Sequence, residues 1–219
     1  LSSMQEGEIA IIPEAYKDTK TAAHLITYKD ERDLASSFGI EIDKVSFKGA
    51  FLMDALLAMA VDKILFDRVD YAKINSFVID PHRQEELRDS KNRLWVNDTK
   101  ATNLDATIVA LKRYKEHHVR LILGGDDKGV DLSELFAYLQ NCDVKIYTIG
   151  SNKEKLCTLA QQYSVAFVLC KNLADAVAQI DKVLQADEVA LLSPAAASLD
   201  EFKSYADRGD QFKAAIRAL

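Results

Sequence analysis

Short apolar runs alternate with longer amphipathic segments throughout the second part of the chain. The apolar runs predict strands at 94–96, 119–123, 144–149, 165–169 and 189–192. Apolar residues recur at helical spacing between these runs and predict helices at 104–114, 132–139, 153–163 and 173–184. Repeated β–α units of this kind predict an α/β fold, a Rossmann-like, doubly wound parallel sheet with helices on both faces.

The first 80 residues follow a different pattern. Short strands are predicted at 8–13, 23–28 and 41–47, with polar turns between them. One strong helix is predicted from about 49 to 65, where alanine, leucine and methionine dominate and leave no wide polar face. Pro81 lies where the two patterns meet, and proline interrupts regular structure. We therefore expect two domains, 1–80 and 81–219.

The composition is that of a globular protein. The chain has 219 residues, enough for about one and a half domains of ordinary size, and 48% of them are hydrophobic. A net charge of −6 gives the surface no broad attraction for nucleic acid or anionic lipid. The three cysteines are an odd number at wide spacing, which is typical of reduced thiols in a cytoplasmic protein. Neither a bilayer-spanning run nor an export signal is visible, so we expect a cytoplasmic location and neither nucleic-acid nor membrane partners.

Three of the loops that follow predicted strands carry residues suited to ligand binding. Ligands of open parallel sheets gather beyond the carboxyl ends of the strands. The loops at 97–103, 124–129 and 193–198 would bring Lys100, Thr102, Lys128 and Ser198 to that edge. Two cations and two hydroxyls are the set needed to hold a small dicarboxylate.

The same loops also contain helix-start signals. Either Thr102 or Asn103 is expected to cap the helix that follows the first loop, and another helix is expected to begin near Ser198. The loops at 150–152 and 170–172 carry no comparable chemistry.

Several catalytic motifs are missing from the sequence. It contains no GxSxG, no HExxH and no GxGxxG after a strand, and no phosphate-binding GxxxxGK[ST] loop. Any ATP chemistry would therefore need another segment to supply that loop. The pair His117-His118 has no carboxylate or cysteine partner at metal-ligand spacing, so packing or surface exposure is favoured over metal binding. Trp95 lies within a predicted strand and is expected in the core.

Four ordered motifs make the chain resemble the C-terminal portion of a Mur ligase. The motifs are Pro81-His82-Arg83-Gln84-Glu85, Asn97-Asp98-Thr99-Lys100-Ala101-Thr102-Asn103, Gly124-Gly125-Asp126-Asp127-Lys128-Gly129, and the stretch 192–209. The last two resemble the branch of the family that adds D-glutamate. The resemblance implies that residues 1–80 are the end of the central P-loop ATPase domain and that residues 81–219 are the amino-acid-binding domain. The P-loop, the carbamylated lysine and the metal ligands would then lie upstream, and this chain would hold no catalytic residue.

The resemblance also implies an activity. It is an ATP-dependent amide ligase of peptidoglycan synthesis that joins D-glutamate to UDP-N-acetylmuramoyl-L-alanine through an acyl phosphate, with Mg²⁺ stabilising the developing charge. The residues implied for the nucleotide are Arg83 and Asp98. The residues implied for D-glutamate are Lys128, Thr102, Ser198, the backbone at Leu199 and Tyr205, and Lys100, which is shared between substrate and phosphate. A monomer, inactive without the upstream part, is expected.

Two positions depart from the family pattern. Ala50-Phe51 replaces the usual His-Asn at the start of the long helix, which puts one adenine contact in doubt, and Tyr205 replaces a common Phe. Two alternatives stay open. One is a ligase of the folylpolyglutamate synthase type, which adds L-glutamate. The other is a non-catalytic α/β signalling module such as a phosphoacceptor receiver, although Ile149-Gly150 and Ser193-Pro194 stand where a receiver needs an acidic residue and a lysine.

Overall fold

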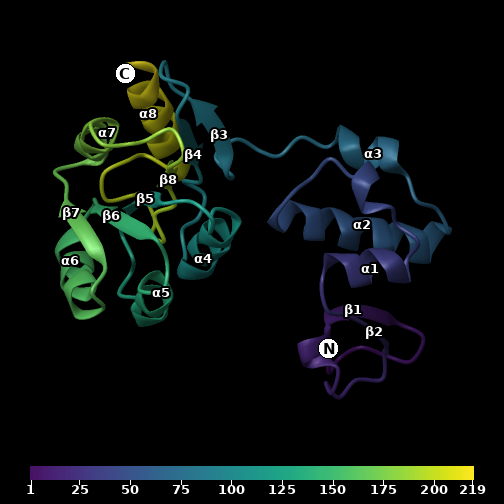
Figure 1. Ribbon diagram of the computed structural model, residues 1–219. Helices are drawn as coiled ribbons and strands as arrows, with labels where there is room; N and C mark the ends of the chain where they lie inside the picture. The colour runs from purple at the N-terminus through teal and green to yellow at the C-terminus, as the bar shows by residue number, and fades with distance from the viewer. The chain divides into compact units, whose positions relative to one another are not determined.

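A computed structural model describes the backbone of residues 1–219 and every side chain except that of Ala50. The chain divides into two compact units, Leu1–Val78 and Ile79–Leu219 (Figure 1). We describe each unit by itself. The departure from the family pattern at Ala50-Phe51 lies partly outside the described residues, because the Ala50 side chain is not among them.

The second unit is built on a six-stranded sheet with the strand order β3-β4-β8-β5-β6-β7. All neighbours pair in parallel except β3, which runs antiparallel to β4. The strands are β3 (Glu85–Arg88), β4 (Leu94–Asn97), β5 (Val119–Leu123), β6 (Val144–Thr148), β7 (Ala166–Leu169) and β8 (Val189–Leu192). The predicted α/β class and parallel sheet are confirmed, and the five predicted strands agree with the observed ones to within a residue at each end.

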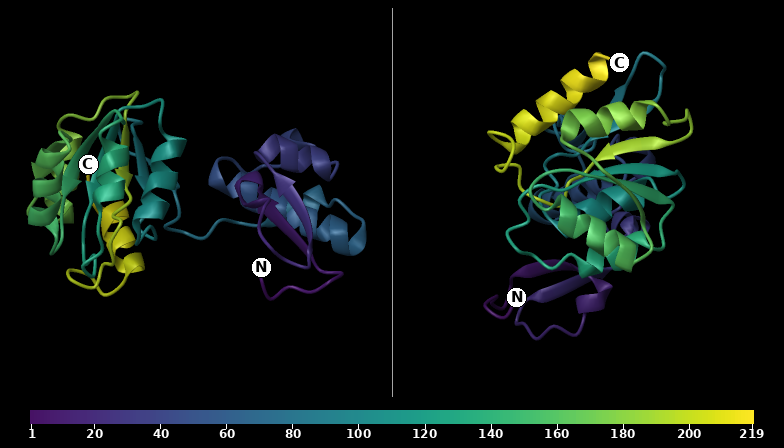
Figure 2. Two further views of the ribbon diagram at one scale, coloured as in Figure 1. Left: turned by 90° about the horizontal axis from the view of Figure 1, so that it is seen from below. Right: turned by 90° about the vertical axis from the view of Figure 1, so that its left-hand side faces the viewer.

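Helices cover both faces of this sheet, as Figures 1 and 2 show. They are α4 (Leu104–Arg113), α5 (Ser133–Leu139), α6 (Lys153–Gln162), α7 (Leu173–Asp181) and α8 (Tyr205–Arg217). Side chains of α4, α5 and α6 pack into one core with one face, and those of α7 and α8 pack into a second core with the other. On β5, Leu121 and Leu123 enter the first core while Ile122 between them enters the second. This alternation explains why the strands are mostly apolar, because a strand covered on both faces buries side chains of both orientations.

Two elements of this unit differ from the sequence prediction. The strand β3 was not predicted, since its sequence is short and mostly charged. The prediction that a helix begins near Ser198 is wrong. The helix α8 begins only at Tyr205, and Ser204 caps it by accepting a hydrogen bond from the Asp207 N–H at 3.1 Å. Between Ser198 and Ser204 the chain forms turns instead.

The first unit has less regular structure. Its elements are a parallel pair of strands, β1 (Ile9–Pro13) and β2 (His24–Tyr28), three α-helices, α1 (Glu31–Ser37), α2 (Ala50–Phe66) and α3 (Tyr71–Ser76), and two short 3₁₀ helices, Glu14–Tyr16 and Ile42–Lys44. Nowhere in the described residues is there a helix long and apolar enough to cross a membrane.

The strand predicted at 41–47 is wrong. Residues 42–44 form a 3₁₀ helix, and side chains of α3 take the hydrogen bonds that a strand partner would have made. The Glu41 N–H donates to Tyr71 Oη at 2.8 Å, and the Ser46 N–H donates to Asn75 Oδ1 at 2.9 Å. The alternation of apolar residues there reflects packing against α1 and α2 rather than pairing in a sheet.

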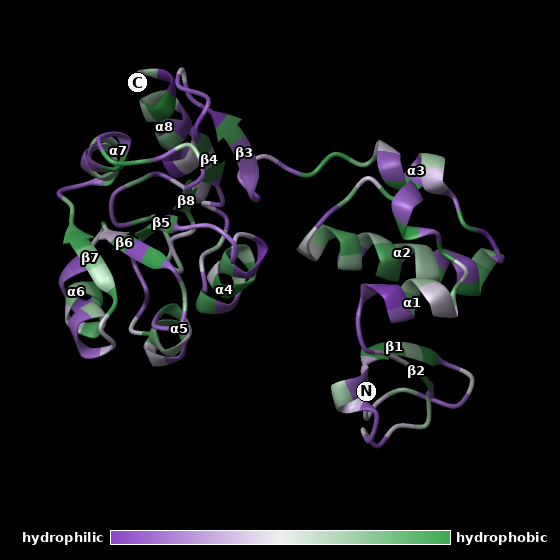
Figure 3. Ribbon diagram, in the orientation of Figure 1, coloured by the Kyte–Doolittle hydropathy of each residue, from purple (hydrophilic) through white to green (hydrophobic). Residues whose placement is uncertain are grey.

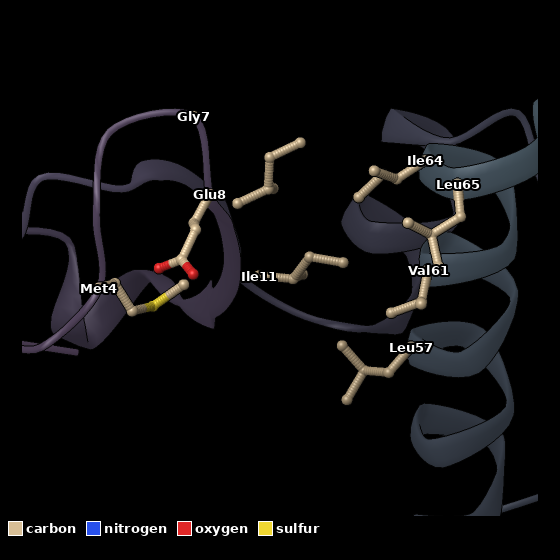
Figure 4. A pocket seen from close by; sticks show the side chains of 9 residues that line it. Met4, Gly7, Glu8, Ile11, Leu57, Val61, Ile64 and Leu65 are labelled. Atoms are coloured by element: carbon tan, nitrogen blue, oxygen red, sulfur yellow. The ribbon is translucent and has the colours of Figure 1, made fainter.

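The first unit also leaves much apolar surface exposed. Figure 3 shows α2 hydrophobic over much of its length, and its buried side chains cover only part of that surface. A cavity of about 550 Å³ separates β1 from α2 and is lined by Ile11, Leu57, Val61 and Ile64 among others (Figure 4). Leu65 at its rim is 65% exposed. Two parallel strands beside an open apolar groove do not form a complete core.

A chain that starts at Ile79 is therefore expected to unfold cooperatively in urea, because both of its sheet faces are covered. Trp95, the only tryptophan, is fully buried in this unit, so its fluorescence reports the transition directly. The isolated 1–78 segment is expected to give no cooperative transition by far-UV circular dichroism. A sharp melt of that segment would contradict this picture of an incomplete core.

Candidate functional site

Three loops meet at the carboxyl edge of the second unit's sheet. The first loop (98–103) follows β4, the second (124–132) follows β5 and the third (193–204) follows β8. The Asp98 N–H donates to the Leu192 carbonyl at 2.8 Å, and the Gly124 N–H donates to the Pro194 carbonyl at 2.9 Å. Asp126 and Ala197 pair as an isolated antiparallel bridge. Backbone hydrogen bonds thus join the second loop to the third and hold the first loop against the end of β8.

A buried guanidinium fastens this surface to α8. The Arg208 side chain is fully buried, and its Nε–H donates to Thr99 Oγ1 at 2.8 Å. Its Nη2 donates to the carbonyls of Thr99 at 2.9 Å and Ala196 at 3.1 Å, and Nη1 donates to the Ala197 carbonyl at 3.3 Å. Burial lowers the pKa of Arg208 to about 10, so the group stays charged at neutral pH. Within the described side chains it makes no ion pair, and it therefore adds a positive field to the edge.

Asp98 in the first loop is nearly enclosed. It is 6% exposed, its Oδ1 accepts a hydrogen bond from the Gln84 N–H at 3.1 Å, and its Oδ2 accepts one from Ser193 Oγ at 2.8 Å. Burial raises its pKa to about 6, against the smaller opposing effects of these two hydrogen bonds. A ligand hydroxyl would meet only the lone pairs of the carboxylate that these two donors leave unused.

Arg83 stands on a strained turn beside the first loop. Its neighbours His82 and Gln84 have φ angles of 70° and 45°, a region that side chains rarely occupy. The His82 ring holds the turn: Asn97 Nδ2 donates to its Nδ1 at 3.0 Å, and Gly209 of α8 lies so close that a Cβ there would stand 2.3 Å from Nδ1. The guanidinium of Arg83 itself is exposed.

The remaining residues expected in the first loop lie at its surface. Lys100 Nζ is 3.7 Å from Asp80 Oδ2 and 5.8 Å from the centre of the Tyr205 ring. Thr102 is exposed, and Asn103 rather than Thr102 caps α4, with its Oδ1 accepting the Ala106 N–H at 2.9 Å. The Thr102 hydroxyl is therefore not needed by the helix.

In the second loop, Lys128 is exposed and adopts a φ of 52°. A left-handed backbone costs a lysine about 1–2 kcal/mol, so the surrounding contacts must hold it. The Lys128 N–H donates to Asp126 Oδ1 at 3.0 Å, and the Gly129 N–H donates to Asp127 Oδ1 at 2.9 Å.

The third loop brings a buried hydroxyl and a helix start to the same edge. Ser198 is 3% exposed, whereas Leu199 is 70% exposed. Tyr205 is the first residue of α8, so its backbone N–H has no acceptor inside the helix. Its carbonyl accepts a hydrogen bond from Thr99 Oγ1 at 3.1 Å, which ties the helix start to the first loop.

The sequence prediction missed the loop after β6. Ser151 Oγ donates to the Gly125 carbonyl at 3.1 Å, and Asn152 Oδ1 accepts the Gly125 N–H at 3.0 Å. The backbones approach closely enough that a Cβ at Gly124 would stand 2.1 Å from the Ile149 carbonyl oxygen. Glycines after β5 and again after β6 were the available signal, because close approach of two loops needs residues without side chains. Arg208 was also missed, since a single arginine in a helix gives no hint of burial.

This arrangement defines a class: a parallel α/β domain whose carboxyl edge carries cations, hydroxyls and unpaired helix N–H groups that suit an anionic small molecule. The model of the family described as "Mur ligase, glutamate ligase domain" matches residues 82–196. The chain belongs to this family.

Curated relatives agree with this assignment. The chain is 50% identical over all 219 residues to a UDP-N-acetylmuramoylalanine--D-glutamate ligase of Campylobacter jejuni, and it covers 54% of that protein. It is 41% identical over 231 aligned residues to the protein of the same name in Helicobacter pylori, with 99% of this chain and 54% of the relative covered. The chain thus spans about half the length of the curated relatives it matches.

Solved structures share the fold at low sequence identity. A bifunctional folylpolyglutamate synthase/dihydrofolate synthase from Yersinia pestis has a TM-score of 0.61 at 15% identity, covering 96% of this chain and 53% of the other. The UDP-N-acetylmuramate-alanine ligase MurC of Thermotoga maritima has a TM-score of 0.54 at 15% identity, covering 78% and 38%.

Replacement of Arg208 by Met is expected to lower the free energy of unfolding of the second unit by roughly 3 kcal/mol, because the buried carbonyls of Thr99 and Ala196 and the Thr99 hydroxyl lose their donor. Urea titration followed by Trp95 fluorescence measures this. Arg217→Met on the same helix removes an exposed arginine and is expected to change stability by no more than about 0.5 kcal/mol. Equal effects of the two changes would rule out a stabilising role for the Arg208 hydrogen bonds.

Replacement of Asp98 by Asn is expected to stabilise the second unit at pH 8 by up to about 3 kcal/mol. The pKa of Asp98 is raised in the folded protein to about 6, so the folded state favours the protonated carboxyl, and stability is lost as pH rises from about 4 to about 6. The gain should therefore shrink as pH falls from 8 to 4.5 in urea titrations.

Asp89→Asn is the matched control, with the opposite sign. Although burial opposes it, hydrogen bonds from Arg93 and Trp95 lower the pKa of Asp89 to about 2. Asp89 therefore contributes stability above about pH 4, and this replacement should destabilise the protein throughout the measured range. A change of stability in the same direction for both replacements would contradict the opposite pKa shifts of Asp98 and Asp89.

Proposed function

We propose that this chain is the C-terminal part of an ATP-dependent ligase that joins D-glutamate to UDP-N-acetylmuramoyl-L-alanine in peptidoglycan synthesis. The observation that carries the proposal is the 50% identity, over the whole chain, to a protein named for that reaction. The charge distribution at the sheet edge supports it independently, because the substrate to be held is a dicarboxylate.

The second unit would bind the incoming amino acid. Lys128 is exposed and can place an ammonium against one carboxylate, and Thr102 and Ser198 offer hydroxyl donors. The Tyr205 N–H and the backbone at Leu199 complete the set of donors, with the positive start of α8 behind them. Arg208 adds a fixed positive charge under the same edge. Lys100 stands beside Tyr205, where it can serve the amino acid or a phosphate group.

The reaction has two steps. The terminal phosphoryl group of ATP passes to the L-alanyl carboxylate, and ADP leaves. The amine of D-glutamate then attacks the acyl carbon, the C–O bond to phosphate breaks, and the nitrogen loses its proton as the amide forms. Mg²⁺ with ATP would screen the phosphate charge in the first step.

Residues of this chain would assist at the nucleotide. Arg83 is exposed on its rigid turn and can neutralise the transferred phosphate. Asp98, with its remaining lone pairs, can accept one hydrogen bond from a nucleotide hydroxyl. No residue of this chain is assigned the bond-making step itself.

The first unit would be the end of the ATP-binding domain, whose P-loop, carbamylated lysine and metal ligands lie on a preceding segment. The open groove between β1 and α2, and a sheet of only two parallel strands, support this assignment, because such surfaces need a further layer to cover them. We further propose that the enzyme acts in the cytoplasm, where its water-soluble substrates would be found, and that it is a monomer.

The likeness in fold to folylpolyglutamate synthases keeps an L-glutamate ligase as a second candidate. Stereochemistry separates the two, because both enzymes would use the same cations for the two carboxylates. A signalling module has less support, since Ile149-Gly150 and Ser193-Pro194 offer neither the acidic residue nor the lysine of a phosphoacceptor site.

In the full-length ligase, formation of ADP is expected with D-glutamate and UDP-N-acetylmuramoyl-L-alanine, and not with L-glutamate. Lys128→Met should raise the KM for D-glutamate at least about tenfold, because a charge-assisted hydrogen bond is lost, and leave the KM for ATP unchanged. Lys171→Met removes an exposed lysine after β7 at the same sheet edge and should alter neither constant. Preference for L-glutamate would overturn the substrate assignment.

A further inference from the structure

We propose that Asn152 is a positioning residue that holds the second loop so that Lys128 can meet the amino-acid carboxylate. The inference rests on the proposed function for the role of Lys128. It goes beyond that function because it assigns a role to Asn152, in the loop after β6, for which no substrate contact is proposed. The evidence is that the Asn152 side chain does not cap its own helix and instead makes two hydrogen bonds to the second loop.

Asn152 stands at a helix start and does not cap it. Asn103 before α4 and Asn172 before α7 both cap, with Oδ1 accepting the N–H three residues later. Asn152 occupies the same position before α6, with φ of −98° and ψ of 9°, and makes no such bond. Its amide is turned away from the helix, even though capping is the usual use of an asparagine at this position.

The amide binds the second loop at two points instead. Oδ1 accepts the Gly125 N–H at 3.0 Å, and Nδ2 donates to Asp127 Oδ2 at 3.0 Å. The residue is 8% exposed, so both bonds are shielded from water. A primary amide carries its acceptor and its donor on separate atoms, so one Asn152 side chain can accept from the Gly125 N–H and donate to the Asp127 carboxylate at once.

Asp127 passes this restraint to the residue after Lys128. Its Oδ1 accepts the Gly129 N–H at 2.9 Å, while Oδ2 receives both Asn152 and Lys155 Nζ, the latter at 2.8 Å. Burial acts in the opposite direction, but the hydrogen bonds from Asn152 and Lys155 lower the pKa of Asp127, which keeps the carboxylate ionised. Lys155 Nζ also donates to the Val130 carbonyl at 2.7 Å.

Lys128 needs this support because nothing else near it is packed. Lys128, Gly129 and Val130 are all exposed, and a Cβ at Gly129 would touch nothing within 4 Å. The left-handed backbone of Lys128 is therefore kept by polar contacts from its own loop and from the start of α6. Without Asn152, Asp127 loses its shielded donor, and the loop gains freedom where the ammonium must be placed.

The test uses the full-length ligase with Asn152→Ala and measures two independent quantities. Hydrogen exchange should show the amides of 125–130 exchanging at least about tenfold faster than in the parent protein. Steady-state kinetics should show the KM for D-glutamate raised roughly tenfold, with kcat and the KM for ATP changed by less than about twofold.

Asn172→Ala is the matched control. It removes an asparagine from the start of the next helix at the same sheet edge, and one that does cap. It is expected to lower thermal stability without changing the KM for D-glutamate or exchange in 125–130. If it raised the KM as much as Asn152→Ala does, loss of stability alone would account for the effect, and the proposal would fall.

A charge exchange provides the rescue. Asn152→Asp keeps the acceptor for Gly125 and sets a carboxylate against Asp127, so it should raise the KM for D-glutamate further than Asn152→Ala does. Adding Asp127→Asn restores a donor opposite an acceptor and should recover part of the loss, since Lys155 Nζ then loses its carboxylate acceptor on residue 127. Failure of the pair to recover would count against the specific bond between these two side chains.

The remaining outcomes separate the inference from the proposed function. Unchanged exchange in Asn152→Ala would overturn the positioning role whatever the kinetics. Faster exchange with an unchanged KM for D-glutamate would also overturn it. The kinetics of Lys128→Met then test the proposed amino-acid site separately. A raised KM for D-glutamate in Lys128→Met would support the proposed amino-acid site, whereas an unchanged KM would contradict it.

Discussion

A single buried cation determines how the functional edge of this protein is organised. The Arg208 guanidinium is enclosed without a carboxylate beside it among the described side chains, so its donors must be satisfied by carbonyls and a hydroxyl. Those acceptors belong to the first and third loops, which are far apart in sequence. Satisfying one side chain therefore fixes α8 against both loops.

The edge combines such rigid points with local strain. His82, Gln84 and Lys128 all have positive φ angles, and each lies beside or at a residue proposed to touch a ligand. None of these conformations is stable by itself. His82 is held by Asn97 and by the closeness of Gly209, and Lys128 by carboxylates of its own loop and the amide of Asn152. The regular sheet supplies the fixed frame from which these contacts act.

Most elements of the second unit follow from local pattern. Its central strands are apolar at most positions because both faces are covered, and its helices keep a clear period, so both were predictable. The strand β3 was not, since Glu85-Glu86-Leu87-Arg88 has almost no apolar signal and forms only because β4 has a free edge beside it. The 41–47 segment was misjudged for the converse reason. It alternates like a strand, but Tyr71 and Asn75 take its backbone hydrogen bonds.

The sequence by itself determined the fold class and the family, because periodicity and contiguous motifs are local properties of the chain. It did not determine that Arg208 lies under the loops after β4 and β8, that α8 begins at Tyr205 rather than near Ser198, or that Asn152 turns from its helix to the loop after β5. Each of these depends on which distant backbone groups come within hydrogen-bond distance. Only tertiary packing decides that, since a polar side chain at a loop end has several partners open to it until the fold removes all but one.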